Sequence, residues 1–309
     1  MLRTIRMSVL ITGGAGFIGG HLAAACRALG PVRVLDDLSG GDRHNLDEQD
    51  VEFQQGSITD PGAVARAMQG IDTVFHLAAF VSVPASMADP LACARLNVQG
   101  LLTVLEAAEA AGVRRLVFAS SAAVYGDDPT VPKRESMVPQ PRSPYALTKL
   151  DGEFYCEHYA RRGRIRTACA RFFNVFGPRQ RPDSAYAAAV PGFITRALQG
   201  VPLVIYGDGE QTRDFIYVGD VVDGLVHLAQ RPELGGAFNV GYGVATTVNY
   251  LAGEICRLTG SGSPCQHLPE RPGDVRHSVA AVERIRATGW RPRYSLETGL
   301  AETVAWYRR

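Results

Sequence analysis

The chain has 309 residues and a net charge of +1, with 46% hydrophobic and 20% charged residues. This length suits one large domain or two closely joined domains, and the apolar content is sufficient for a packed core, which excludes a disordered chain. Arginines alternate with acidic residues and form no long basic run, which argues against nucleic-acid binding.

The cysteines, the histidines and the N-terminus indicate the redox state, the metal content and the compartment to expect. The six cysteines are scattered without a CxxC pair, so we expect buried free thiols. The seven histidines show no ligand spacing, which argues against a metal site. Because no signal peptide or membrane-spanning stretch is visible, we expect a protein of the reducing cytoplasm without a membrane partner.

The first half of the chain alternates short β-branched runs with helical segments, a pattern typical of βα units. The expected strands are Ser8–Thr12, Val32–Asp36, Val51–Gln54, Thr73–Leu77, Leu116–Ser120 and Thr167–Phe172. The expected helices are Gly16–Leu29, Pro61–Met68, Leu91–Ala111 and Ser143–Arg161. This order predicts an α/β fold with a Rossmann-type, doubly wound parallel sheet.

After Phe172, frequent proline and glycine residues interrupt the regular alternation of strands and helices. Strands are expected again at Phe215–Val218 and Ala237–Val240, where the chain would return to the sheet, followed by helices at Val248–Leu258 and Leu296–Tyr307. We therefore expect a cofactor-binding domain of residues 1–172 with about 213–240. Residues 173–212 and 241–309 would form a smaller C-terminal α/β domain that binds the substrate.

A glycine-rich loop between the first strand and the first helix indicates a dinucleotide site. Gly13, Gly16 and Gly19 in GGAGFIG allow a tight turn and let a pyrophosphate reach the helix N-terminus. Asp36 ends the second strand, where its carboxylate can bind the ribose hydroxyls and repel a 2′-phosphate, so NAD is favoured over NADP. The alternative is that Asp36 is a capping or loop acid.

Small residues follow the third and fourth strands, at the edge where cofactors lie in such sheets. They permit close approach of the backbone to a cofactor. The positions expected to line the cofactor here are Ser57, Ile58, Leu77, Ala78 and Ala79.

Tyr145 and Lys149 form the pair most indicative of catalysis. Of 32 basic residues only two are lysines, Lys133 and Lys149, so Lys149 is expected to do something that a guanidinium cannot. Four residues apart on a helix, the ammonium can stand beside the phenol and favour its ionised form, which would make Tyr145 a usable base.

Ser121 closes the strand before this helix, and its hydroxyl can share a substrate oxygen with the tyrosine. With these residues together, the chain resembles the extended short-chain dehydrogenase/reductase family and, within it, the nucleotide-sugar 4-epimerases. The resemblance runs from the glycine loop to the end of the chain. It rests on TGGAGFIG, Asp36, HLAA, SSAAVYG, Tyr145-x-x-x-Lys149, RFFN at 171–174 and GDGEQTRDFIYV at 207–218.

The resemblance implies a role for each matching residue. Ser121, Tyr145 and Lys149 take the catalytic positions, and Tyr145 and Lys149 also contact the cofactor. Further NAD contacts are implied for Phe17, Ile18, Asn97 and Phe172. Ser57 departs from the family, which usually has an aspartate there to bind the adenine amine, so this adenine contact is in question.

For the substrate, the resemblance implies a nucleotide diphosphate held by Asn174, Arg213, Arg271 and Asp274, with Val190 and Tyr206 near the base and ribose. Two arginines suit this task because guanidinium groups bind phosphate as forks. As alternatives, Arg213 could form a surface ion pair with Asp214, and Arg271 could be a loop cation.

Ala122 and Ala123 separate sister reactions of the family. Dehydratases place an Asp-Glu pair there and decarboxylating relatives keep a glutamate, whereas two methyl groups supply no acid or base. We therefore expect an NAD-dependent epimerase that inverts C4 of a UDP-hexose through a 4-keto intermediate. A net nucleotide-sugar dehydrogenase or reductase and a non-catalytic NAD-sensing protein are the alternatives.

Two residues point to different sugars. Ser278 matches a family position where tyrosine restricts the pocket and a small residue admits an N-acetyl group. Arg181 resembles the loop of epimerases that act on UDP-glucuronate, although Asn174 departs from those enzymes, and a solvent-exposed loop charge is an equal alternative. The resemblance also implies a homodimer through Leu91–Ala111 and Ser143–Arg161.

Overall fold

The structure, a computed structural model, describes residues 7–47, 49–182, 189–270 and 275–309. The chain divides into two compact units. The first unit contains Met1–Val124, Pro141–Arg171 and Val222–Phe238, and the second contains Tyr125–Gln140, Phe172–Val221 and Asn239–Arg309. Within the described ranges, no helix combines the length and hydropathy needed to cross a membrane.

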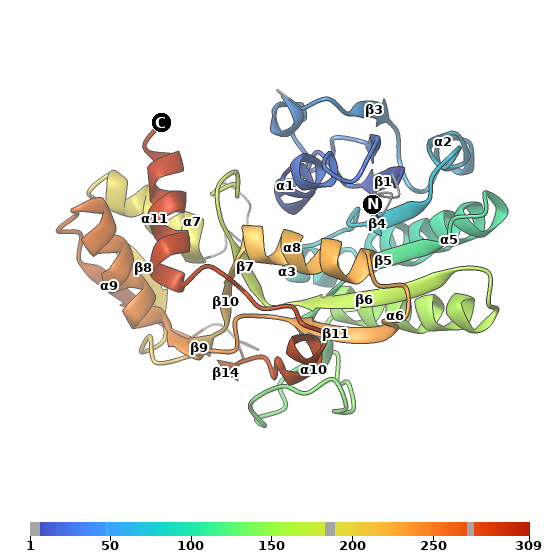
Figure 1. Cartoon of the computed structure of the whole chain (residues 1–309). Helices are drawn as coiled ribbons and strands as arrows, with labels where there is room; N and C mark the ends of the chain where they lie inside the picture. Colours follow the sequence, from blue (N-terminus) through green and yellow to red (C-terminus); the bar gives the residue numbers. More distant parts are fainter. Residues whose placement is uncertain (1–6, 48, 183–188, 271–274) are drawn as a thin grey trace. The chain divides into compact units, whose positions relative to one another are not determined.

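A seven-stranded sheet in the order β11-β6-β5-β4-β1-β2-β3 organises the first unit (Figure 1). The strands are β1 (Val9–Thr12), β2 (Val32–Asp36), β3 (Glu52–Gln55), β4 (Thr73–His76), β5 (Arg115–Ser121), β6 (Arg166–Phe172) and β11 (Gly236–Val240). Neighbours from β3 to β5 are parallel. The strand order reverses between β1 and β4, the point at which doubly wound sheets bind their ligands. The expected fold class is confirmed.

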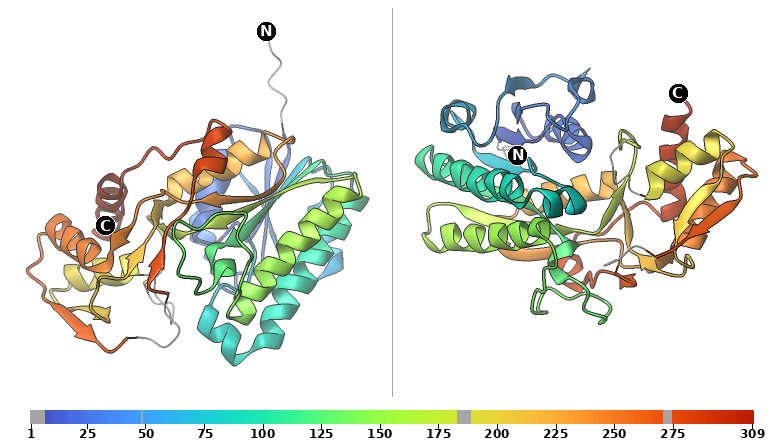
Figure 2. Two further views of the ribbon diagram at one scale, coloured as in Figure 1. Left: turned by 90° about the horizontal axis from the view of Figure 1, so that it is seen from below. Right: turned by 180° about the vertical axis from the view of Figure 1, so that it is seen from behind.

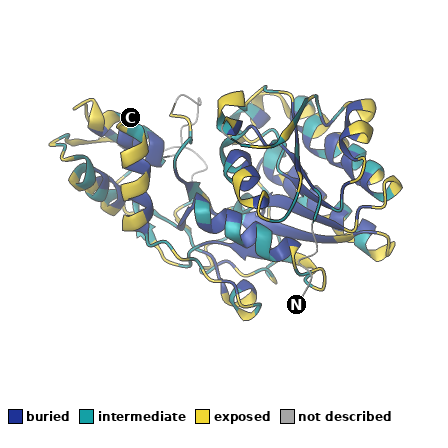
Figure 3. Cartoon of the chain, turned by 45° about the horizontal axis from the view of Figure 1, so that its top comes forward, coloured by how far each residue is buried: buried dark blue, intermediate teal, exposed yellow. Residues whose placement is uncertain are grey.

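Helices cover both faces of this sheet, and their exposed sides face outward (Figure 3). They are α1 (Phe17–Cys26), α2 (Pro61–Ala67), α3 (Val83–Ala88), α4 (Pro90–Ala94), α5 (Gly100–Ala110), α6 (Pro144–Arg161) and α8 (Val218–Ala229). A π-helical segment, Arg95–Gln99, joins α4 to α5, and α5 and α6 lie side by side (Figure 2). Leu91–Ala111, expected as one helix, is therefore interrupted.

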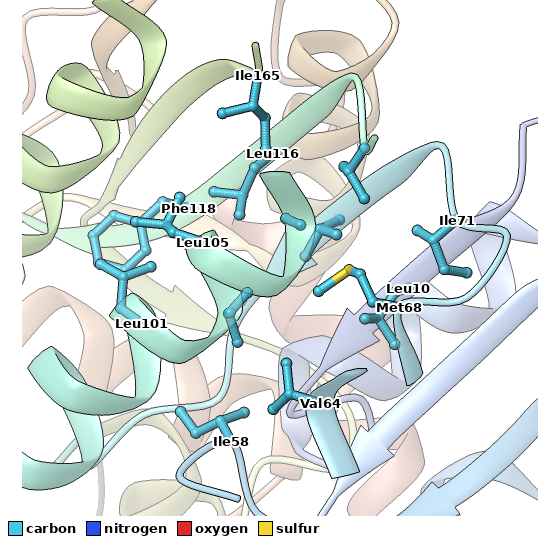
Figure 4. Close-up of a cluster of buried hydrophobic side chains, with 14 of the residues drawn as sticks. Leu10, Ile58, Val64, Met68, Ile71, Leu101, Leu105, Leu116, Phe118 and Ile165 are labelled. Carbon is cyan, nitrogen blue, oxygen red and sulfur yellow. The ribbon is translucent and has the colours of Figure 1, made fainter. Parts of the chain in front are cut away.

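The core of the first unit lies where α2, α5 and α6 pack on alternate residues of the strands (Figure 4). Burial of these side chains is the main favourable contribution to folding. The cluster includes Leu10, Leu35, Val64, Met68, Val74, Leu101, Leu105, Leu116, Phe118 and Cys156. The intervening residues Val9, Ile11 and Val34 are also buried, so neither face of the sheet is open to water.

The second unit contains smaller sheets with α7 (Ala189–Leu198), α9 (Val248–Thr259), α10 (Glu283–Ala287) and α11 (Leu296–Tyr307). One sheet pairs β7 (Asn174–Phe176) with β10 (Phe215–Tyr217), and another pairs β8 (Leu203–Tyr206) with β13 (Cys265–Leu268). The third has the order β12-β9-β14, from Thr246–Thr247, Thr212–Arg213 and His277–Ser278.

Two features of this unit differ from the sequence expectation. The strand expected at Phe215–Val218 pairs with β7 and does not rejoin the large sheet, whereas β11 does. Tyr125–Gln140 groups with the second unit because it is tied there by hydrogen bonds. The Tyr125 hydroxyl donates to Asn239 Oδ1 at 2.6 Å, and the backbone of Lys133 pairs with Val279 and Ala281.

Gly152 sets how closely α6 approaches β5. A Cβ atom at this position would lie 2.4 Å from Cζ of Phe118, a buried core residue. Phe118 is packed on all sides and cannot move away cheaply.

We predict that Gly152→Ala lowers the free energy of unfolding by about 1–3 kcal/mol because the helix must shift away from the sheet. The matched control is Gly253→Ala at an exposed position of α9, where nothing lies within 4 Å of the added methyl. That variant should be neutral or more stable by up to about 1 kcal/mol. Urea denaturation measures both, and equal stability of the two variants would contradict the prediction.

Candidate active site

Helix α6 carries the catalytic pair, and its start is set by local sequence. Ser143 is the N-cap, with its hydroxyl accepting from the Ala146 amide at 3.2 Å, and Pro144 occupies the first turn, where a missing N–H costs little. The Tyr145 amide donates to Ser86 Oγ of α3 at 3.2 Å. These contacts determine where on the helix Tyr145 and Lys149 fall.

The structure brings Ser121, Tyr145 and Lys149 together. The Ser121 hydroxyl at the end of β5 is hydrogen bonded to the Tyr145 side chain. Lys149 is buried, its Nζ donates to the carbonyl of Ala119 at 2.8 Å, and it lies 5.8 Å from the centroid of the Tyr145 ring. Lys149 Nζ also lies 5.0 Å from the centroid of Phe118, within cation–π range.

The pKa values of this pair differ from the sequence expectation. Loss of water around the Tyr145 phenol raises its pKa, and the hydrogen bond from Ser121 only partly opposes this. Burial lowers the pKa of Lys149 to about 8. The protein residues therefore do not produce the expected lowering of the Tyr145 pKa, because Lys149 Nζ is directed at the Ala119 carbonyl and its charge is itself destabilised by burial.

The glycine loop at the end of β1 has the properties that a pyrophosphate requires. Gly13 has φ +73°, and a Cβ there would lie 2.6 Å from the backbone nitrogen of Ala78, so glycine is needed. Gly16 is the N-cap of α1 but provides no side-chain cap, and the first turn holds no acidic residue. The amides of Phe17, Ile18 and Gly19 thus begin a helix whose positive end suits an anion. Packing explains Gly19, since its Cβ would lie 2.2 Å from the carbonyl oxygen of Gly13.

Asp36 lies beside this loop at the end of β2 and is buried. Its two oxygens accept from the amides of Ala15 at 2.9 Å and Leu38 at 2.8 Å, so it does hold the turn as the alternative interpretation supposed. Burial raises its pKa, while these two hydrogen bonds act in the opposite direction. Each carboxylate oxygen can accept a further hydrogen bond, so structural and ribose-binding roles are compatible.

The other expected cofactor positions lie at the same edge of the sheet. The amides of Leu77 and Ala78 donate to the carbonyl of Thr12, which places this segment, with Ala79, against the glycine loop. Ile58 is buried against Gly100, and Ser57 bonds to Thr59. Phe172 ends β6 and is half-buried.

Asn97 is placed differently from a simple ligand-binding residue. Its side chain is buried in the π-helical segment and bonds both backbone groups of Phe80, with Oδ1 accepting at 2.7 Å and Nδ2 donating at 3.1 Å. Nδ2 also donates to Thr148 Oγ1 at 2.9 Å. These bonds occupy the amide donors, so Asn97 joins the segment after β4 to α6. A π-helical segment is itself a feature found often at functional sites.

The second unit contains the described residues expected to bind the nucleotide diphosphate of the substrate, whereas Ser121 belongs to the first unit. Arg213 and Ser278 are neighbours in the β9–β14 ladder, and Tyr206 ends β8. Asn174 is exposed at the start of β7, whereas the Val190 side chain is buried in α7. Arg271 and Asp274 lie outside the described residues.

Asp214 holds the backbone next to Arg213, a role that the sequence analysis missed. It is fully buried, and its carboxylate accepts from the amides of Tyr242, Gly243 and Ala280 at 2.7–3.0 Å. Burial raises its pKa to about 6. The ion pair considered for Arg213 and Asp214 is therefore wrong. The available signal in the sequence was the position of Asp214 between a predicted substrate arginine and the apolar strand expected at Phe215–Val218.

Comparison with known proteins assigns the family. The model of the NAD dependent epimerase/dehydratase family matches residues 9–241. The chain belongs to this family. NAD as the cofactor is thereby confirmed, and the uncapped start of α1 with Asp36 beside it fits that group.

This epimerase/dehydratase is similar to proteins that it matches over nearly its whole length. UDP-glucose 4-epimerase of Mycolicibacterium smegmatis is 39% identical, with 98% of this chain and 99% of the relative covered. The structure of UDP-glucose 4-epimerase from Thermotoga maritima with UDP-glucose has 38% identity and a TM-score of 0.93, covering 98% and 99%. UDP-N-acetylglucosamine 4-epimerase from Methanobrevibacter ruminantium has 37% identity and a TM-score of 0.94, covering 98% of both chains.

Among the residues that the structure describes, no three His, Cys, Asp or Glu side chains are grouped so that they could hold a metal ion. Four of the chain's six cysteines are buried, Cys256 is half-buried and Cys265 is exposed.

We predict that Lys149 titrates with a midpoint of about 8 in the NAD-free protein. Because the chain has two lysines, ¹³C-lysine labelling yields two ε-carbon signals, and Lys149→Arg assigns them. Between about pH 8 and 10.5 the unfolded chain holds this proton and the folded protein does not, so the Lys149 contribution to stability rises with pH by about 3 kcal/mol in total. A midpoint near 10.5 would show that Lys149 is hydrated.

Proposed function

We propose that the protein is a UDP-hexose 4-epimerase that inverts C4 of UDP-glucose or UDP-galactose and tolerates the N-acetylated forms. The observation that carries the proposal is the arrangement of Ser121, Tyr145 and Lys149 at the end of β5. Ala122 and Ala123 follow directly in a 3₁₀ turn and supply no acid or base for elimination or decarboxylation. The likeness to 4-epimerases over 98% of the chain supports the same reaction.

Tyr145 acts as the base in this reaction. Its phenolate removes the proton from the sugar 4-hydroxyl, and Ser121 donates to the same oxygen, so that the proton leaves as C4 becomes a carbonyl. NAD held by the glycine loop and Asp36 would supply the hydride acceptor and donor for C4, and its positive ring would favour the Tyr145 phenolate that burial disfavours. Tyr145 then returns the proton, so no external oxidant is consumed.

Lys149 contributes a buried positive charge and hydrogen-bond donors. One of its three N–H groups is used by Ala119. The other two are available to the cofactor ribose, which would orient the nicotinamide against Tyr145. Arginine fits this position poorly because its planar guanidinium is larger than an ammonium and cannot donate to the Ala119 carbonyl with the same geometry.

The second unit would hold the nucleotide diphosphate. Arg213 supplies a charged fork, and Asp214 fixes the strand that carries it. Asn174 and Tyr206 belong to the same proposed site, together with Val190, Arg271 and Asp274. If the diphosphate stays bound, the 4-keto sugar can rotate to present its other face without dissociating from the enzyme.

Tyr145→Phe and Lys149→Arg are each predicted to lower kcat at least about 100-fold, the scale of a lost general base, while NAD stays bound. Tyr159→Phe is the control, since it removes a hydroxyl from the same helix that bonds Glu106 instead of the site. Interconversion of UDP-glucose and UDP-galactose and the released NAD are measured. Near-normal turnover of either catalytic variant would refute the assignment, and stoichiometric NADH formation would indicate a net dehydrogenase.

UDP-glucuronate is the second candidate substrate, because Arg181 is exposed in the loop after β7 and could face a C6 carboxylate. MoeE5, 36–37% identical to this chain with a TM-score of 0.88, has been crystallised with UDP-glucuronic acid and also with UDP-glucose. That likeness therefore does not separate the sugars. We favour the neutral hexose because Asn174 departs from the UDP-glucuronate epimerases and an exposed loop charge explains Arg181 equally well. Ser278, which is small, leaves room for an N-acetyl group.

Ser278→Tyr is predicted to lower kcat/KM for UDP-N-acetylglucosamine at least about 10-fold and for UDP-glucose less than about threefold, since a filled pocket excludes the larger sugar. Ser278→Ala, which keeps the pocket open, is the control. A preference for UDP-glucuronate that disappears in Arg181→Ala would establish the second candidate instead.

The homodimer remains part of the proposal. Apolar side chains are exposed on α4 and α6, with Leu91 82%, Phe154 59% and Leu147 49% exposed. Exposed apolar residues grouped on helices mark protein contacts, and two such helices from each of two copies can form a four-helix bundle.

Sedimentation velocity should yield about twice the chain mass of 33.3 kDa. Phe154→Glu should produce a monomer because it would place a charge in the apolar contact. Leu198→Glu, on α7, is the control that should remain dimeric. A monomeric wild-type protein would remove this part of the proposal.

A further inference from the structure

Glu153 lies on the same face of α6 as the catalytic pair. It follows Lys149 by four residues and Tyr145 by eight, and residues four apart on a helix share one face. Unlike most glutamates it is buried, with 8% of its side chain exposed. The reaction described above has no use for this carboxylate.

The last three residues of β5, residues 119–121, contact these three helix positions. Lys149 Nζ donates to the carbonyl of Ala119 at 2.8 Å, and Ser121 is hydrogen bonded to Tyr145. Between these two contacts, Ser120 Oγ donates to Glu153 Oε1 at 2.5 Å. Three hydrogen bonds thus join the end of β5 to one face of α6, and Glu153 accepts one of them.

Arg171 of β6, the neighbour of β5, holds Glu153 from the other side. Its Nε donates to Oε1 at 2.8 Å and its Nη2 to Oε2 at 2.7 Å, a bidentate pair. The two side chains are 5% and 8% exposed. A buried ion pair contributes little net stability because both charges lose water, but it tolerates very little displacement. Its best-attested use is to fix the register of packed elements.

We propose that Glu153, held by Arg171 and Ser120, is a positioning residue that fixes α6 against β5 and thereby the geometry of Tyr145 and Lys149. Displacement of a reacting group by about 1 Å can cost about 100-fold in rate. The role in turnover rests on the proposed epimerase function, whereas the effect on Lys149 does not.

The kinetic test removes both charges together. In the triple variant Glu153→Leu, Arg171→Met, Ser120→Ala, apolar residues replace the network, and such replacements usually preserve stability. We expect an unchanged urea midpoint, a KM within about threefold of wild type and a kcat lowered at least about 10-fold. A stable triple variant with wild-type kcat would show that the network is structural and overturn the proposal.

Lys149 provides a readout that needs no turnover. Loss of the Glu153–Arg171 pair leaves the net charge unchanged, and Ser120→Ala, which keeps the pair, separates a change of geometry from a change of the local field. In NAD-free, ¹³C-lysine-labelled protein, we expect the Lys149 midpoint to move by at least about half a unit toward its ordinary value, while Lys133 stays. Tyr159 lies farther along α6 and its hydroxyl bonds Glu106 of α5, so Tyr159→Phe should move neither signal.

Ser120→Ala keeps the ion pair intact and serves if the triple variant does not fold. It should perturb the Lys149 signal in the same direction with a smaller amplitude. An unchanged Lys149 signal in a folded variant contradicts the proposal. If the signal moves but neither wild type nor variant turns over a UDP-sugar, the proposed function has failed and the positioning role stands.

Discussion

The close packing of α6 on β5 is the constraint on which the active site depends. Gly152 allows the helix to touch Phe118, and the ring of Phe118 in turn lies under Lys149 Nζ. This contact buries the lysine, and burial is what lowers its pKa. It also brings Tyr145 within hydrogen-bond reach of Ser121. The absence of a side chain at Gly152 therefore permits both the close helix–strand contact and the burial that lowers the pKa of Lys149.

Burial shifts the pKa values of Tyr145 and Lys149 in opposite directions, and both shifts disfavour the charged form of the group. It raises the pKa of Tyr145 and lowers that of Lys149. The protein alone thus holds the phenol neutral. A positive cofactor ring next to the phenol would reverse this preference. Such an arrangement would couple ionisation of Tyr145 to occupancy of the cofactor site.

Carboxylates that bind backbone amides position both the cofactor loop and the expected diphosphate site. Asp36 joins the amides of Ala15 and Leu38 in the first unit, and Asp214 joins three amides next to Arg213 in the second. Each carboxylate accepts hydrogen bonds from backbone N–H groups that lie in irregular segments and therefore have no carbonyl partner in a helix or sheet. Asp36 retains acceptor capacity for a ribose, whereas buried Asp214 has a structural role.

Local patterns in the sequence determined the fold class, the glycine loop, Asp36 and the spacing of Tyr145 and Lys149, because strand alternation, tight turns and helix faces depend on neighbouring residues. The strand of β10 was placed in the wrong sheet, since pairing partners are chosen by packing far along the chain. Tertiary structure alone decided that Arg171 meets Glu153, that Ser278 lies beside Arg213, and that Lys149 Nζ reaches Ala119. Burial sets the pKa values for the same reason, as it depends on residues distant in sequence that fold around each group.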